Sequence, residues 1–279
     1  MISRIVTDFR KSVAFRAADE IALFRALAAS IVKYSSSAFV DETHGGNVCN
    51  VRFTSVMGKT EICEIADLLI ISADPIHSNL RATFWQAKKQ AVSKWLGVTS
   101  CGSQLDFKGQ FNQWDLLCRR PTVSGVASFV PPPDLLSSFS SSSIGSFGVF
   151  YERASATEVA HSIAEFLACP SPTSKHPTLT INGCLDKYCF SQAEVITRRD
   201  LPSFLSALFA FQVGALLDPS LPTHRWLVSW VRSKASAGAP PAALRSLDKF
   251  LGNAMPADIG DSTNSIGLSI LIVGAPHEA

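Results

Sequence analysis

Three polar residues in the first third of the chain have types and spacing suited to chemistry on a negatively charged group. Asp67 directly precedes the apolar run 68–71, and Gln86 and Lys88 stand in the segment 82–90. Carboxylate and amide oxygens are ligands for a hard cation such as Mg²⁺, and an ammonium group stabilises negative charge that develops beside it. These three residues are therefore the first candidates for a catalytic site.

Two segments with strand character would position these residues. Residues 61–72 begin polar and end apolar, which predicts a strand with Asp67 where it passes from surface to interior. Residues 82–90 form the next predicted strand, and because side chains alternate across a strand, Gln86 and Lys88 point to the same face. A turn at 57–60 joins the first strand to a preceding strand at 47–56, as in a hairpin.

The rest of the chain alternates between helical and strand patterns. Residues 18–34 carry apolar positions at helical spacing, with Asp19 and Glu20 in the first turn. Residues 103–120 are predicted as a helix, with Gly109 as a break. Further strands are predicted at 123–130, 148–152 and 266–274, and further helices at 155–167, 200–217, 224–235 and 240–253.

The order of these elements resembles the core of the PD-(D/E)xK nuclease superfamily: a helix with Glu20, a strand with Asp67, a strand with Gln86-Ala87-Lys88, and a helix. Branches of that superfamily have glutamine at the second acidic position, and this chain has ADLLII followed by FWQAKK. The resemblance covers roughly residues 15–155, and Ala66 stands where the motif has proline. It implies a restriction-endonuclease-like α/β fold with a central mixed β-sheet flanked by helices.

The resemblance also implies an activity, the hydrolysis of DNA phosphodiester bonds with Mg²⁺ or Mn²⁺ as cofactor. Asp67 and Gln86 would be metal ligands, and Lys88 would orient the attacking water or stabilise the developing charge. Glu20 and Glu64 are both candidates for a further acid. We favour Glu20, since Glu64 has the opposite strand parity to Asp67 and would face away unless the strand bulges. Bacterial restriction or anti-phage defence is the setting that the resemblance implies.

Composition and charge are those of a folded protein with an anionic partner. The chain has 279 residues, 47% hydrophobic and 17% charged, enough to bury a sizeable core. Its formal net charge is +2, but residues 81–120 carry seven basic and two acidic side chains, a local charge of +5. Local positive charge suits a phosphate-bearing partner. Lys89, Lys94 and Lys108 are the predicted contacts to nucleic acid.

The cysteine spacing and the lack of signal or membrane segments limit the class of protein that the sequence can encode. The seven cysteines form no CxxC pair, and no segment has the pattern of a secretory signal or a membrane span, so a cytoplasmic protein is expected. We divide the chain into a nuclease core at 1–155 and a mainly helical C-terminal region at 156–279 that completes the core or binds a protein partner or a second copy. Two other functions stay open, a catalytically inactive scaffold with the nuclease fold and an RNA-directed nuclease.

Overall fold

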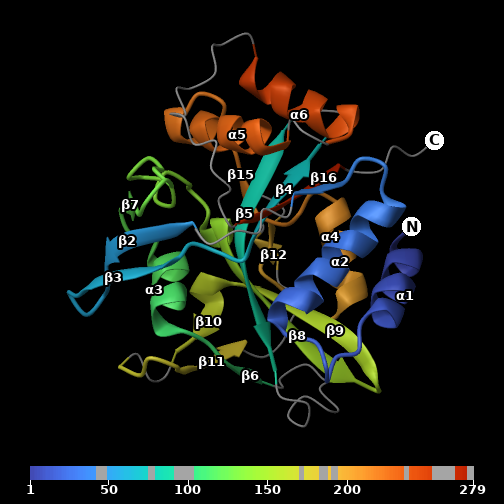
Figure 1. Ribbon diagram of the computed structural model, residues 1–279. Helices are drawn as coiled ribbons and strands as arrows, with labels where there is room; N and C mark the ends of the chain where they lie inside the picture. Colours follow the sequence, from blue (N-terminus) through green and yellow to red (C-terminus); the bar gives the residue numbers. More distant parts are fainter. Residues whose placement is uncertain are drawn as a thin grey trace.

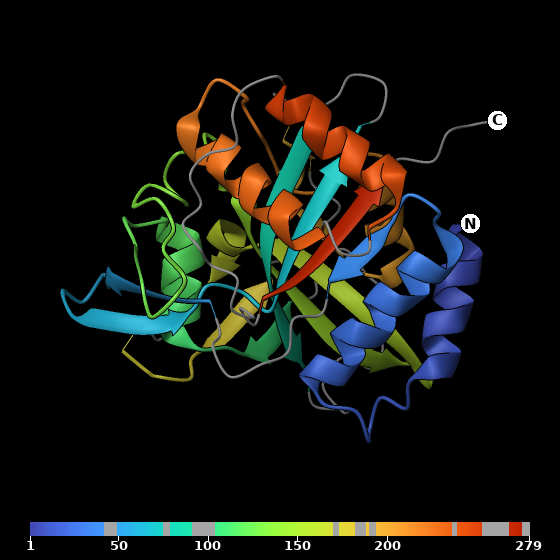
Figure 2. The same cartoon turned by 45° about the horizontal axis from the view of Figure 1, so that its top comes forward.

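The computed structural model describes residues 1–41, 49–74, 79–90, 104–169, 173–181, 188–189, 194–235, 239–252 and 268–274. These residues form a mixed α/β structure in which helices cover both faces of a central sheet (Figures 1 and 2). None of the helices within these ranges has the length and apolar character needed to cross a membrane. The α-helices are α1 Ile2–Ser12, α2 Glu20–Tyr34, α3 Phe111–Arg119, α4 Leu201–Phe209, α5 Pro222–Ala235 and α6 Pro241–Leu251.

The central sheet has mixed strand directions. Its order is β1-β16-β4-β5-β8-β9-β14, and β15 also pairs with β5. β4 is antiparallel to β5, whereas β5 is parallel to β8 and β16 is parallel to β4. The strands are β1 Phe39–Asp41, β4 Leu68–Ala73, β5 Leu80–Lys89, β8 Gly145–Arg153, β9 Ala156–Ile163, β14 Thr197–Arg198, β15 Ala215–Leu216 and β16 Ser269–Gly274.

Both faces of this sheet are buried, each in its own hydrophobic core. Leu69 of β4 and Phe84 of β5 pack into one core, with the apolar side chains of α5 and α6. Leu68 and Trp85 point the other way and pack with α1, α2 and α4. Because every side chain of β4 is buried, this strand reads as a continuous apolar run and shows no polar alternation.

Smaller sheets flank the central one. The strands β2 Asn50–Thr54 and β3 Thr60–Glu64 form an antiparallel hairpin, and β7 Ser124–Gly125 pairs with β2. Figure 1 shows this hairpin beside α3, with its turn extending away from the central sheet. The other small sheets are β10 Leu167–Ala168 with β11 Thr178–Ile181 and β6 Leu105–Lys108, and β12 Tyr188–Cys189 with β13 Glu194–Val195; the 3₁₀ helices are η1 Ser142–Ile144 and η2 Ala164–Phe166.

Several sequence predictions are confirmed. The helix at 18–34 is α2, capped by the Asp19 side chain, which accepts a hydrogen bond from the backbone N–H of Ala22 at 2.7 Å. The hairpin turn, the strand at 82–90 and the final strand are present as the β2–β3 turn, β5 and β16. The helices at 224–235 and 240–253 are α5 and α6, and the helix at 200–217 is the shorter α4.

Other predictions are wrong, and most of the errors concern strands. Residues 155–167 form β9 and η2 in place of a helix, because Val159 and Ala160 are buried on opposite faces of the sheet and hide the period-two pattern. The first part of 103–120 is strand β6, with Leu105 and Phe107 buried in alternation. The strand predicted at 123–130 is reduced to β7, and α1 was not predicted.

The strand predicted at 61–72 is two strands in two different sheets. β3 ends at Glu64 in the hairpin, and β4 begins at Leu68 in the central sheet. The chain changes sheets at 65–67. Asp67 therefore lies just before β4, at the junction of two sheets, and strand parity does not relate its direction to that of Glu64.

The region beyond residue 155 also contributes to the central sheet. β9, β14, β15 and β16 all belong to the sheet that contains β4 and β5. β16 pairs with β4 along all six residues of both strands. The division of the chain at residue 155 stays a prediction, and these strands fit the alternative in which the later part completes the core.

Candidate active site

The site predicted from the sequence lies at an end of β5 that extends beyond β4. The register pairs Leu68 with Trp85, so β4 starts there and leaves the last residues of β5 unpaired on that side. Two carboxylates occupy the unpaired strand edge. Asp67 Oδ2 accepts from the backbone N–H of Ala87 at 2.7 Å, and Glu20 Oε1 accepts from that of Lys89 at 3.0 Å. The two N–H groups are two residues, or about 7 Å, apart along the strand.

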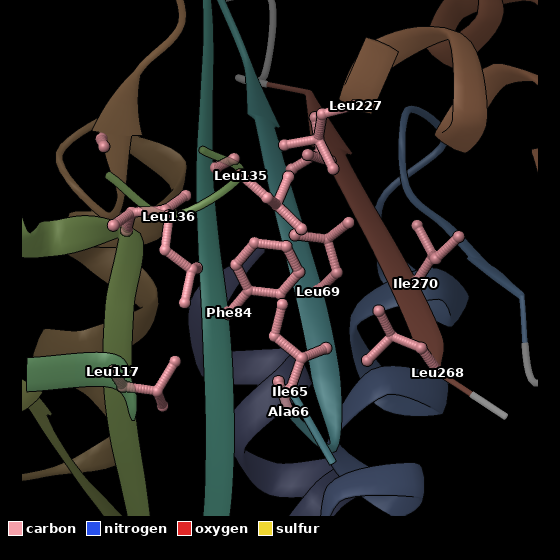
Figure 3. Close-up of a cluster of buried hydrophobic side chains, with 14 of the residues drawn as sticks. Ile65, Ala66, Leu69, Phe84, Leu117, Leu135, Leu136, Leu227, Leu268 and Ile270 are labelled. Atoms are coloured by element: carbon pink, nitrogen blue, oxygen red, sulfur yellow. The ribbon is translucent and has the colours of Figure 1, made fainter. Parts of the chain in front are cut away.

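The position of Asp67 is held by apolar neighbours. Ile65 and Ala66, which precede it, are fully buried and pack in the core that contains Leu69 and Phe84. Figure 3 shows Ile65 and Ala66 at the end of β4, next to these side chains. The apolar pair fixes the chain where it changes sheets, and the polar Asp67 follows at the edge of that core.

Gln86 and Lys88 face the same side of the sheet as predicted, and both side chains are buried. Gln86 is 1% exposed and Lys88 is 6% exposed. The Gln86 Nε2 amide donates to Asp67 Oδ2, whereas its Oε1 has no hydrogen-bond partner among the described residues. Lys88 Nζ lies 3.6 Å from Glu20 Oε2. The helix acid and the two strand residues therefore meet at one place.

Electrostatics connect Glu64 with the same group. Burial and the Asp67 carboxylate together raise the pKa of Glu64 to about 7, against the opposing effect of the Lys88 ammonium. The argument from strand parity, which set Glu64 aside, is wrong because its premise of a single strand is wrong. Glu64 lies at the end of the hairpin, within electrostatic range of Asp67 and Lys88. Both candidates for the further acid thus remain near the site.

Burial also changes the proton affinity of Asp67. It raises the pKa of Asp67 to about 6, although the Lys88 ammonium and the Ala87 N–H both favour the charged form. The Glu20 carboxylate adds to the rise. A carboxyl group whose charge is this poorly solvated gains more from a nearby cation than a surface carboxyl does.

The oxygen atoms at this end of β5 are of the type that a hard divalent cation binds. Asp67, Glu20 and Glu64 carry carboxylates, and Gln86 Oε1 is a buried oxygen without a partner among the described residues. No group of three or more His, Cys, Asp or Glu side chains placed to hold a metal occurs in the described ranges. A cation at Asp67 would therefore depend on the amide oxygen of Gln86 in addition to carboxylates, and oxygen-only ligation suits Mg²⁺ or Mn²⁺.

Lys89, predicted to contact nucleic acid, has internal partners. Its Nζ donates to the backbone oxygen of Ala18 at 2.6 Å and lies 4.8 Å from the ring centroid of Phe15. Both contacts are to the segment just before α2. Lys89 thus anchors the start of the helix that carries Glu20, a long-range contact for which the sequence has no local signal.

The other predicted nucleic-acid contacts are placed differently. Lys94 lies outside the described residues. Lys108 is exposed on β6, and its Nζ donates to Thr178 Oγ1 at 2.9 Å. Much of the remaining positive charge in segment 81–120 serves the fold, since Arg119 binds the Asp115 carboxylate and Arg120 donates to the backbone oxygen of Phe139 at 3.0 Å.

Comparison with known proteins finds no matching family model, no similar curated protein and no similar solved structure. The resemblance to the nuclease superfamily therefore rests on Asp67, Gln86 and Lys88 and on the geometry described above.

Proposed function

We propose that the protein is a metal-dependent nuclease that hydrolyses phosphodiester bonds of DNA at the end of β5 that extends beyond β4, in a restriction-endonuclease-like fold. The observation that carries this proposal is the convergence of Glu20 from the start of α2, Asp67 from the junction before β4, and Gln86 and Lys88 from β5. Oxygen ligands for a cation together with one buried ammonium can stabilise the charge that develops in phosphodiester hydrolysis. The order of the helix and the two strands also agrees with that of the superfamily.

Each residue would have a separate task. Asp67 and Gln86, with Glu20 or Glu64, would hold a Mg²⁺ or Mn²⁺ ion. That ion, when bound, would supply positive charge to the phosphate and acidity to a water molecule. Gln86 contributes an oxygen without charge, so the site should bind the cation more weakly than a site with glutamate at this position.

Lys88 would act on the reacting groups directly. Its ammonium is buried, and its partner Glu20 lies at 3.6 Å with 42% of the Glu20 side chain exposed. An ammonium in this setting retains donors with which it can orient the attacking water and stabilise the added negative charge on the phosphate. The water oxygen would bond to phosphorus as the water proton passes to solvent, and the bond from phosphorus to the leaving sugar oxygen would break as that oxygen takes up a proton from solvent.

A nuclease assay tests the proposal. Purified protein is incubated with supercoiled plasmid, linear duplex, single-stranded DNA and RNA, with Mg²⁺, Mn²⁺ or EDTA. We expect cleavage of DNA that EDTA stops and that Asp67→Asn abolishes. Glu165→Gln, which changes an exposed acid in η2, is the matched control and should cut like the parent.

Other outcomes distinguish the alternatives. Cleavage of RNA alone would replace DNA by RNA as the substrate, since the hydrolysis requires no 2′-hydroxyl group. A folded protein that binds neither Mg²⁺ nor Mn²⁺ in calorimetry and cuts no substrate would support the inactive scaffold. The internal contacts of Lys89, Arg119 and Arg120 are the specific observation in favour of that scaffold, because they remove cations from a DNA-binding surface.

A further inference from the structure

The β2–β3 hairpin exposes apolar side chains. Val56 and Met57 at its turn are 54% and 52% exposed, and Ile62 on β3 is 47% exposed. The turn itself is well formed, with hydrogen bonds from the Ser55 N–H to the Lys59 carbonyl and from the Gly58 N–H to the Ser55 carbonyl. Apolar side chains exposed on an ordered hairpin indicate a binding surface, whereas a polar hairpin surface gives no such indication.

The exposed face of this hairpin leads to the candidate active site. The register places Arg52 opposite Ile62 and Asn50 opposite Glu64. These side chains share one face, which we call the outer face, while Val51, Phe53 and Cys63 point the other way and are buried in the core. Glu64, at the base of the outer face, ends β3 and precedes Asp67 by three residues in the chain. The outer face therefore leads from the apolar turn to the start of the junction that carries Asp67.

The cations of the hairpin are available to a ligand. Arg52 lies on the outer face and Lys59 at the turn, and both are exposed. Neither side chain forms an ion pair or hydrogen bond with another described residue. Of the two acids in the hairpin, Glu61 belongs to the opposite face and Glu64 to the site. Between the turn and Glu64, the outer face thus presents positive charge, hydroxyl groups and apolar groups.

We propose that the outer face of the β2–β3 hairpin binds the polynucleotide on one side of the bond that is cut. This inference rests on the proposed function. Arg52 and Lys59 would contact phosphates, while Ile62 and Met57 would pack against sugars or bases. The six residue-to-residue steps from Gly58 to Glu64 span about 20 Å, which matches about six nucleotides at about 3.4 Å each.

The test measures binding and cleavage separately. The double variant Arg52→Ala/Lys59→Ala is compared with Arg4→Ala/Lys11→Ala, which removes the same charge from exposed positions of α1 on the other side of the sheet. Affinity for fluorescein-labelled single-stranded and duplex DNA is measured by fluorescence anisotropy in Ca²⁺ at several salt concentrations. Cleavage is measured in Mg²⁺ on substrates shortened from either end.

We expect the hairpin variant to lose affinity by about tenfold or more, with the slope of log affinity against log salt reduced by about two. The parent should need about six nucleotides on one side of the cut, and the hairpin variant should lose this length dependence. The α1 variant should keep the parent's affinity, and circular dichroism should show both variants folded.

Three results would overturn the proposal, and each has a different meaning. A hairpin variant that binds and cuts like an active parent would remove the hairpin from the substrate path and leave the nuclease intact. A parent that neither binds nor cuts any nucleic acid would overturn the proposed function as well. If Ile62→Ser converts a dimer to a monomer in light scattering and leaves DNA affinity unchanged, the free edge of β3 is a protein interface.

Discussion

The strand β5 buries one cation near each end, and the two are held in different ways. Arg81 donates to Glu194 at 3.0 Å and to the backbone oxygen of Gly214 at 2.8 Å, and its guanidinium lies 5.1 Å from the ring centroid of Phe211. Among the described residues, Lys88 has one ion-pair partner, the Glu20 carboxylate at 3.6 Å. A buried charge with close, multiple partners is part of the fold, whereas one with few partners remains able to act on a ligand.

The acidic residues around these two cations also differ in how well their charges are compensated. At the Lys88 end, burial raises the pKa values of Asp67 and Glu64. At the Arg81 end, Glu194 is tied to Arg81 and also accepts from Ser141 Oγ at 2.5 Å. Burial of charge alone therefore does not identify a functional site. Acidic residues whose charges are poorly compensated, next to a cation with few partners, are a better indication of one.

The largest effect expected from this comparison is on catalysis at the Lys88 end. Lys88→Met should lower the cleavage rate by about 10²–10⁴-fold, because the developing charge loses its ammonium partner. Its melting temperature should stay close to that of the parent. Rates under single-turnover conditions and a thermal melt check this, with Lys11→Met on α1 as the control. If a folded Lys88→Met variant cleaved DNA like the parent, neither Lys88 nor Arg81 would have a role in catalysis, and the two ends of β5 would not differ in this respect.

The next effect is on stability at the Arg81 end. Arg81→Met leaves Glu194 buried without its cation and should reduce the free energy of unfolding by about 3–5 kcal/mol. Urea denaturation measures this value. Where the variant remains folded it should cut DNA like the parent, since Arg81 has no part in the chemistry. A stable but inactive Arg81→Met protein would contradict the assignment of Arg81 to the fold.

Gln86 tests whether the Lys88 end binds a cation. Gln86→Glu places a second carboxylate beside Asp67 and should keep or raise activity, while Gln86→Ala should lose it. Without metal, Gln86→Glu should be less stable than the parent, because two close carboxylates repel each other. Added Mg²⁺ should reverse this loss in a thermal melt. A Gln86→Ala variant with the parent's response to Mg²⁺ would show that the amide is not a ligand.

The smallest effect is on the pH dependence of stability. Asp67 and Glu64 have pKa values of about 6 and about 7, above their ordinary values of 3.8 and 4.5. Their contribution to the free energy of unfolding is therefore fully present below pH 3.8 and is lost as the pH rises through 6 and 7. His161, with a pKa lowered to about 3 by burial, acts in the opposite sense.

The difference between parent and variant isolates the acids from the histidine. The stability of Asp67→Asn relative to the parent should increase from pH 5 to pH 8, because the amide avoids the buried charge. Urea denaturation at four pH values measures this difference. A difference that does not change with pH would mean that Asp67 titrates normally and that its environment is ordinary.

Part of the site could be predicted from the sequence, because the placement of those residues follows from local sequence patterns. The alternation of side chains along one strand placed Gln86 and Lys88 on a common face, and the helical spacing at 18–34 placed Glu20 in the first turn of a helix. The approach of Glu20 to Lys88 followed from the family resemblance. It depends on Lys89 and on the contact of Lys89 with Phe15, which are not apparent in the sequence.

Other parts could not be predicted, because they depend on how distant segments pair. Strands with both faces buried, such as β9, lack a polar alternation and resemble helices in the sequence. The break between β3 and β4 lies in a run without glycine or proline, so no turn residue marks it. The position of that break determines the direction in which the Glu64 side chain points.

The two carboxylates at the end of β5 have a consequence beyond chemistry. The unpaired N–H groups of Ala87 and Lys89 would form the start of an open strand edge, and open edges recruit strands from other molecules. Asp67 and Glu20 occupy both donors and bring negative charge to the edge. The acids that we assign to the reaction thus also protect this strand edge from pairing with other molecules and so from aggregation. A variant that lacks both acids would expose the edge.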